Sequence, residues 1–396
     1  PIAAVTTDIL NNQRSATSPS IGSYEFGGDY APPLIVYTPL TNTATTGART
    51  LIATITDASG VPTSGVGLPV LYWRINNQPY STTQSTWTSG NNYEFTFGAG
   101  AATGDVVSYF IVAQDMNSTP IVGSNPASGA SGFSFDPPAV AVYPVNPNSY
   151  LILGTISGTL TVGTGGDYPS LTGVGGLFQA INNNVLTADV TVNVLSNLTE
   201  TGVVALNQFA TDPINSNYTL TIKPFDATVK TISGAFAGGL IRFNGADNVI
   251  IDGSFANAGQ YLLFENTSGN ANTAVFQFIS LGANAGSINN SIKNSIIRAG
   301  SNSITSTFGI YIGGPVISTT GTGAHNNNIT ISGNIIEKAY YGIYARGVAS
   351  TGVNSGLIIS NNTIGSTVAS NYIGKFGLDI TQCTGALITG NTIFNI

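Results

Sequence analysis

The stretch that decides the fold is residues 329–336, which read ITISGNII. Two later stretches repeat it, residues 357–364 (LIISNNTI) and residues 387–393 (LITGNTI). Aligned on their shared asparagine, the copies are 28 and 29 residues apart, a period typical of stacked supersecondary units. Within each copy, apolar residues alternate with small polar ones, which is the period of a β-strand. The pattern predicts a solenoid whose coils are built from short strands.

A second repeated element precedes each copy. It reads FGIYI at 308–312, YGIYA at 341–345 and FGLDI at 376–380. Each coil therefore carries at least two strands joined by tight turns. The coil lengthens to about forty residues between Ile251 and Ile292, where the extra residues are mostly Gly, Ser, Asn and Thr and favour loops that bulge from a fixed coil.

Equivalent positions of such repeats are expected to stack. Ile331, Ile359 and Ile388 are predicted to form one interior column, with coils about 4.8 Å apart. The corner asparagines are predicted to form a structural ladder in which each side-chain amide bonds the coils above and below. These asparagines are Asn334, Asn362 and Asn391.

The composition describes a packed but weakly charged protein. Of 396 residues, 42% are hydrophobic and 7% are charged, and the formal net charge is −7. This apolar content argues against a disordered chain. The 11 Lys and Arg residues form no basic run, so no nucleic-acid partner is expected. No apolar window reaches about 18 residues, so no membrane insertion is expected.

A polar surface of Ser, Thr, Asn and Gly suits a secreted protein, and we expect an extracellular, cell-surface location. The single cysteine, Cys383, has no partner for a disulfide within the chain and is interpreted as a small buried hydrophobic residue. The single histidine, His325, lies in a loop without further metal ligands and is interpreted as an exposed turn residue. No cofactor and no metal site are expected.

Residues 31–143 have the pattern of a small β-sandwich. Alternating apolar segments such as 51–57 and 70–75 are separated by Gly, Pro and Asn clusters. A tryptophan on a middle strand, Trp73, and a tyrosine entering a late strand resemble the immunoglobulin-like and fibronectin-like pattern without its disulfide. Trp73 is expected in the core, and residues 144–157 are interpreted as a linker.

Residues 158–396 resemble the pectin-lyase-like superfamily. The resemblance lies in the stretch 163–171 (GTGGDYPSL), followed by the coil repeats. It implies an all-β fold class, with a right-handed parallel β-helix over 158–396. It also implies a short helix at about 174–183, because an open solenoid end exposes strand edges that must be covered. Activity does not follow, since this fold carries lyases, hydrolases, esterases and inert stalks.

Residues 1–30 contain DILNNQR at 8–14 and PSIGSYEF at 19–26, which resemble the closing segment of many secreted β-helix modules. We interpret 1–30 as an end cap that completes a preceding β-helix, so that the chain is one unit of an array. The predicted partners are copies of the chain or adjacent repeats, joined head to tail. The predicted assembly interface consists of Ile21, Tyr24, Phe26, Ile393, Phe394 and Ile396.

No catalytic residue is predicted. A glycosidase needs two carboxyl groups roughly 5–10 Å apart. The carboxylates closest in sequence within the β-helix, Asp247 and Asp252, lie at opposite ends of one expected strand, roughly 16 Å apart. We therefore expect no enzymatic activity.

A polysaccharide lyase would instead need a basic residue beside further cations. Its best arrangement here is Arg242, Lys293 and Arg298 on one outer face of the β-helix, with Arg242 facing solvent. The favoured interpretation is that these are isolated, solvated charges. Trp87, in a Ser- and Thr-rich loop, is the aromatic residue best suited to sugar stacking. Trp87, Arg242 and Arg298 are thus the candidate contacts to surface glycans.

The favoured function is a structural repeat unit of a secreted stalk, adhesin or filament. The module order resembles the long surface adhesins of Bacteroidota-type bacteria, which implies export by a type IX route. The alternative is a carbohydrate-binding or polysaccharide-degrading β-helix protein. The two differ in whether three or more polar, charged or aromatic side chains converge in a groove on one face of the solenoid.

Overall fold

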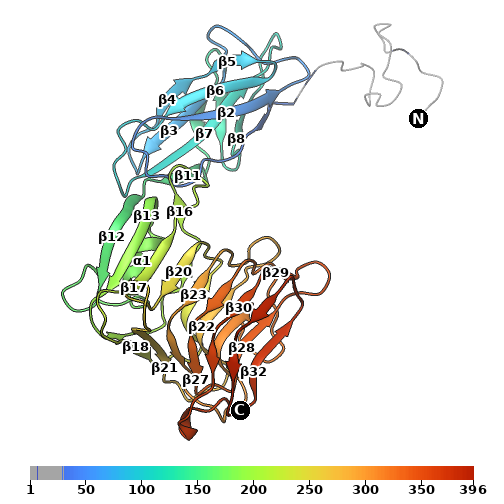
Figure 1. Cartoon of the computed structure of the whole chain (residues 1–396). Coiled ribbons are helices and arrows are strands. Elements are labelled where there is room, and N and C mark those ends of the chain that lie inside the picture. The colour runs from blue at the N-terminus through green and yellow to red at the C-terminus, as the bar shows by residue number, and fades with distance from the viewer. Residues whose placement is uncertain (1–6, 8–28, 30) are drawn as a thin grey trace. The chain divides into compact units, whose positions relative to one another are not determined.

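The computed structural model describes residues 7, 29 and 31–396. It divides into two compact units, Pro1–Ile152 and Leu153–Ile396. The described strands are antiparallel in the first unit and parallel in the second (Figure 1). The predicted all-β class, a sandwich-like unit followed by a parallel β-solenoid, is confirmed. Among the described residues, no helix has the length and apolar character needed to cross a bilayer.

Two main antiparallel sheets build the first unit. In sheet order, the strands of one are β1 (Leu34–Val36), β2 (Arg49–Thr56), β6 (Asn92–Phe97) and β5 (Thr86–Ser89). The strands of the other are β11 (Asn148–Leu151), β7 (Val106–Gln114), β3 (Val70–Ile75) and β4 (Ser81–Gln84), with β8 (Val122–Asn125) also paired to β7. A separate hairpin consists of β9 (Ser131–Ser134) and β10 (Ala139–Val142).

The first unit extends past residue 143. Strand β11 lies in the segment interpreted as a linker, and it pairs antiparallel with β7. Its Tyr150 is buried in the same core as Phe97 and Tyr109, which explains why this short strand belongs to the unit. Trp73 is partly buried and packs against this core, with its ring 6.4 Å from that of Phe97.

Three long parallel sheets and one short parallel pair, β29 (Asn354–Ser355) with β33 (Cys383–Thr384), build the second unit, a solenoid of about seven coils. Sheet I contains β12 (Gly154–Val162), β13 (Asn184–Val194), β17 (Leu220–Pro224), β20 (Val249–Asp252), β23 (Ser291–Lys293), β26 (Thr330–Ser332), β30 (Ile358–Ser360) and β34 (Leu387–Thr389), with β16 (Ala210–Thr211) paired to β13. Sheet II contains β14 (Leu198–Thr199), β18 (Lys230–Gly234), β21 (Leu262–Asn266), β24 (Ile296–Arg298), β27 (Ile335–Glu337), β31 (Thr363–Ile364) and β35 (Thr392–Ile393). Sheet III contains β15 (Leu206–Asn207), β19 (Gly239–Asn244), β22 (Thr273–Ile279), β25 (Thr307–Gly313), β28 (Tyr341–Arg346) and β32 (Phe376–Thr381).

A short helix, α1 (Leu177–Asn182), lies where the sequence predicted one. Its Leu177, Phe178 and Ile181 are fully buried in the solenoid core. The helix packs against β13 and β15, so it covers apolar side chains of the first coils.

The predicted isoleucine column lies in register on sheet I. Ile331 pairs with Ile359, and Ile359 pairs with Ile388. Ile331 and Ile359 are fully buried, whereas Ile388 is 47% exposed. The three positions are equivalent, and Ile388 differs because β34 is the last strand of sheet I in this chain.

The corner asparagines bond successive coils. The Asn362 Oδ1 atom accepts hydrogen bonds from the backbone N–H and the side-chain Nδ2 of Asn334, both 3.0 Å. Asn362 in turn donates from its Nδ2 to Asn391 Oδ1 and to the Ile331 carbonyl, both 2.9 Å. Asn334 and Asn362 are buried, so these amides replace contacts that water would otherwise make.

A second asparagine ladder runs along another corner and was not predicted. Asn354 Oδ1 accepts from the backbone N–H of Asn326, and Asn326 Oδ1 accepts from the backbone N–H of Ser287, both 2.9 Å. The spacing between these two asparagines is again 28 residues. The sequence pattern did not indicate this ladder, because Asn326 lies in a run of consecutive asparagines, residues 326–328, that shows no apolar alternation.

We predict that Asn362→Ala lowers the free energy of unfolding by about 2–5 kcal/mol, because it leaves several buried amide and carbonyl groups without partners. Asn391→Ala is the matched control, since Asn391 has the same role but is only partly buried, and its cost should be about 1 kcal/mol. Urea unfolding of the full chain measures both. A cost below about 1 kcal/mol for Asn362→Ala would contradict the ladder as a source of stability.

Candidate functional site

The three cations that the lyase alternative would group on one outer face lie on three different sheets. Arg242 is on β19 of sheet III, Lys293 on β23 of sheet I and Arg298 on β24 of sheet II. The sequence contains no signal for which sheet each strand joins, because coil lengths vary in this region. The cationic face required by the lyase hypothesis is therefore not formed.

Two of these cations are paired with acids of neighbouring coils. The Lys293 ammonium lies 3.1 Å from the Asp252 carboxylate. Arg298 donates from Nε to Glu337 Oε1 at 2.8 Å and lies 3.9 Å from Glu265. Each pair occupies matching register positions of adjacent strands. Both cations thus form charge ladders along the coils, and the proposed glycan contact of Arg298 is occupied by Glu337.

Arg242 is partly buried, not freely solvated as expected. Its Nη2 donates to the carbonyls of Gly202 at 2.6 Å and Val203 at 2.8 Å, and its guanidinium lies 5.1 Å from the Phe236 ring centre. Burial lowers the pKa of this guanidinium. A depression of about 350 Å³ lies beside it and is also lined by Gln277. Its main contacts are structural, because they hold the 202–203 loop to sheet III.

Trp87 is 42% exposed on β5, near a hairpin turn. Its indole N–H donates to the Gly90 carbonyl at 2.9 Å, and its backbone pairs with Tyr93. One part of the ring is therefore open to solvent while the polar atom is engaged. Trp87 lies in the first unit, whereas Arg242 and Arg298 lie in the second.

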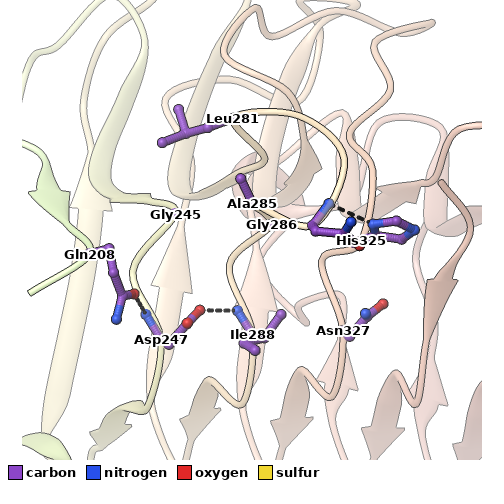
Figure 2. A pocket seen from close by; sticks show the side chains of 10 residues that line it. Gln208, Gly245, Asp247, Leu281, Ala285, Gly286, Ile288, His325 and Asn327 are labelled. Atoms are coloured by element: carbon purple, nitrogen blue, oxygen red, sulfur yellow. Dashed lines mark hydrogen bonds between the residues drawn. The ribbon is translucent and has the colours of Figure 1, made fainter. Parts of the chain in front are cut away.

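A trough of about 530 Å³ lies on the solenoid and is shown in Figure 2. Its long side is a row of residues from successive coils, and its opposite side is the loop at 281–286 (Figure 2). We call it the Asp247 trough. Its lining residues are Gln208, Gly245, Asp247, Leu281, Asn284, Ala285, Gly286, Ile288, His325 and Asn327.

Hydrogen bonds fix the polar side chains of the Asp247 trough. Asp247 Oδ1 accepts from the backbone N–H of Ile288 at 2.7 Å, and the backbone N–H of Asp247 donates to Gln208 Oε1 at 2.9 Å. His325 Nδ1 accepts from the backbone N–H of Asn284 at 2.8 Å, as Figure 2 shows. Sequence reasoning treated His325 as an exposed turn residue and missed this contact, which joins two loops of neighbouring coils.

Burial raises the pKa of the Asp247 carboxyl to about 6, although the hydrogen bond from Ile288 opposes the shift. Among the described residues Asp247 forms no ion pair. Asp252, its expected strand neighbour, is paired with Lys293. The two carboxylates therefore belong to different environments, and the structure does not assemble them into an acid–base pair.

One acidic cluster in the first unit could hold a cation. Carboxylate oxygens of Asp29, Asp57 and Asp115 lie within 4.8 Å of one another, the one such group in the described residues. A hydrogen bond to Asp57 lowers the pKa of Asp29, while burial raises the pKa of Asp57. Carboxylate oxygens are the ligands that Ca²⁺ prefers. No local sequence pattern indicates this group, because its members are far apart in the chain.

The predicted assembly residues are only partly within the described chain. Ile21, Tyr24 and Phe26 lie outside the described residues. Ile393 and Ile396 are exposed, at 41% and 56%, and Phe394 is partly buried.

We predict that Asp247→Asn stabilises the protein at pH 7.5 by on the order of 1 kcal/mol, after discounting a two-unit pKa shift for solvent screening. The folded-state pKa of Asp247 is raised, so its protonated form contributes stability below about pH 4, and this contribution is lost as pH rises through about 6. The variant should therefore show a higher Tm at pH 7.5 and an unchanged Tm near pH 4.

Asp226→Asn is the control, and its effect on the Tm at pH 7.5 is expected to have the opposite sign. A hydrogen bond from Thr228 and the nearby Lys230 lower the pKa of Asp226, so this substitution should lower the Tm at pH 7.5. Thermal unfolding of the three proteins at both pH values is the measurement. A destabilised Asp247→Asn variant at pH 7.5 would contradict the assignment of burial as the dominant effect.

A scan against models of known protein families finds no match for this chain, and a search of curated proteins finds none either. The functional argument therefore depends on the fold and on the geometry of these sites.

Proposed function

We propose that the chain is a structural repeat module of a secreted cell-surface stalk, adhesin or extracellular filament. In this proposal the β-helix is a stiff rod and the antiparallel unit is a spacer. The observation that carries the proposal is the bonding of successive coils by buried asparagine side chains in addition to backbone pairing. Such ladders oppose sliding and opening of the coils, which is what a rod under tension requires.

A second set of contacts, between aromatic side chains, covers the outer face of sheet III. Strands β22 and β25 are buried on both faces. Outside β25 and β28, Phe308 stacks on Tyr341 and Tyr311 stacks on Tyr344, both pairs with ring centres 5.0 Å apart. The Tyr311 and Tyr344 hydroxyls donate to carbonyls of the loop at 314–323. Aromatic stacking of this kind adds to the energy of burial, which supports a mechanical role.

End-to-end assembly is part of the proposal. Apolar side chains on the last coil, including Leu387, Ile388 and Ile393, are exposed. Strand edges with exposed apolar side chains favour pairing with another strand. We propose that Ile21, Tyr24 and Phe26 of one unit cover Ile393, Phe394 and Ile396 of the next.

The finer classification is also a proposal. The resemblance of residues 163–171 to the pectin-lyase-like superfamily and of the first unit to immunoglobulin-like domains supports an origin among Bacteroidota-type surface proteins. The alternative function is a glycan-binding or polysaccharide-degrading protein, and its polysaccharide-degrading form is favoured less because Lys293 and Arg298 are neutralised by neighbouring acids.

We predict that the full chain associates head to tail in a concentration-dependent way, measured by sedimentation velocity. Ile393→Asp and Tyr24→Asp should each keep the protein monomeric, because every junction in a pure sample then contains the charged surface. Val316→Asp is the matched control, since Val316 is 73% exposed on a loop outside this junction.

Mixing the two variants gives a sharper result. A head-to-tail contact uses two different surfaces, so the intact end of each variant should pair to give one-to-one dimers and no longer chains. A monomeric wild-type protein, or unlimited growth in the mixture, would contradict the proposed junction.

The enzymatic alternative has its own test. Incubation with polygalacturonate and alginate should release neither unsaturated nor reducing ends. Turnover that is lost in Arg242→Ala or Arg298→Ala would replace the structural proposal by the lyase.

A further inference from the structure

In the Asp247 trough, a row of polar side chains on successive coils is interrupted by Ile288. Asp247 and Asn327 belong to this row, because the Oδ1 of each accepts a backbone N–H of the next coil, that of Ile288 at 2.7 Å and that of Ser355 at 2.8 Å. Ile288 occupies the position between Asp247 and Asn327, and the three stand in a row along the coils in Figure 2. The isoleucine side chain bonds to neither neighbour. Asp247 Oδ2 and Asn327 Nδ2 therefore have no hydrogen-bond partner among the described residues.

His325 adds a third unused polar atom. Its Nδ1 accepts the Asn284 backbone N–H, so the neutral ring carries its proton on Nε2. No group of the described chain accepts from this Nε2–H. Gly286 permits the arrangement, because a Cβ there would lie 2.1 Å from the His325 carbonyl oxygen. The imidazole is thus held in place with its donor free.

The rest of the lining is apolar or uncharged. Leu281, Ala285 and Ile288 supply an apolar surface, and Leu281 is 57% exposed at the rim. Gln208 and Asn284 supply carboxamides. Asp247 and His325 are the only ionisable residues that line the trough, which has no lysine or arginine. Its volume of about 530 Å³ lies within the range of small-molecule sites, roughly 300–1,000 Å³.

We propose that the Asp247 trough binds a neutral saccharide ring. Its acceptor at Asp247 and its donors at Asn327 and His325 match vicinal hydroxyl groups, which both donate and accept. The apolar face of a sugar ring matches Leu281, Ala285 and Ile288. An anionic ligand is disfavoured by the Asp247 carboxylate, and an ammonium ligand leaves the donors of Asn327 and His325 without acceptors.

This site is independent of the proposed structural role. A stalk without the site still forms a rod, and a saccharide site on a loop of a rod does not require end-to-end assembly. Failure of the assembly test and failure of the binding test are therefore separate results.

The test is NMR titration of the full chain with labelled Ile and Leu methyl groups. The Leu281 and Ile288 methyls are the reporters, assigned from Leu281→Ala and Ile288→Val spectra. The probes are methyl β-D-galactopyranoside, methyl α-D-mannopyranoside and N-acetyl-D-glucosamine, each to 50 mM. Glycerol, glucuronate and butylammonium are the comparison ligands. We expect at least one neutral sugar to shift both reporters in a saturable way, and each comparison ligand to bind more weakly.

Two isosteric variants test the assigned roles. Asp247→Asn exchanges the free acceptor for a donor and keeps an oxygen for the Ile288 N–H. Asn327→Asp exchanges the free donor for an acceptor and keeps an oxygen for the Ser355 N–H. Each should weaken sugar binding about tenfold or more, whereas Asn217→Asp, at an exposed position outside the trough, should have no effect. Unchanged methyl spectra away from the trough establish that the variants fold.

The pH dependence supplies a further readout. Burial raises the pKa of Asp247 to about 6, so wild-type affinity should fall about tenfold between pH 7.5 and pH 5.0 as the acceptor becomes protonated. This fall should disappear in Asp247→Asn. The proposal is overturned if no neutral sugar shifts the reporters, if glycerol or butylammonium binds as well as the sugars, or if both isosteric variants bind like the wild type.

Discussion

In-register stacking of each coil on the coil before it is the constraint on which the rest of the solenoid depends. Strands β23, β26, β30 and β34 pair in parallel without a register shift. A slip of one residue would turn interior isoleucines outward and would also separate the asparagine amides that join the coils. Backbone pairing, apolar burial and side-chain amides therefore favour the same register, and each reinforces the others.

The same register decides where charge is tolerated. Identical charges at equivalent positions would lie one strand apart and repel each other. The chain avoids this by alternating sign, with Glu265, Arg298 and Glu337 in one column and Asp252 beside Lys293 in another. The charges in these two columns are thereby neutralised. Polar groups without partners instead collect where loops leave the coils, as they do around Asp247 and His325.

The sheets and the loops of the solenoid therefore differ in how freely their residues can vary. The sheets are fixed by stacking, so a substitution on one coil alters the packing of both neighbouring coils. A loop such as 281–286 is held at its ends by the coil and is otherwise free to vary, which is why loops commonly carry binding residues on rigid scaffolds. A stiff rod and a ligand site are therefore compatible in one chain, since they use different parts of each coil.

The sequence by itself determined the strand period, the coil repeat, the helix near the first coil and the column of Ile331, Ile359 and Ile388. It also identified the asparagines that bond successive coils. These features were readable because the last coils are 28 and 29 residues apart in the chain, so residues at this spacing occupy equivalent positions on successive coils.

The tertiary structure decided the rest. Longer coils place partners at irregular separations, such as the 41 residues between Asn284 and His325, and three sheets share the strands of each coil. The faces occupied by Arg242, Lys293 and Arg298, the membership of β11 in the first unit, and the grouping of Asp29, Asp57 and Asp115 all depend on such long-range packing, which local patterns do not encode.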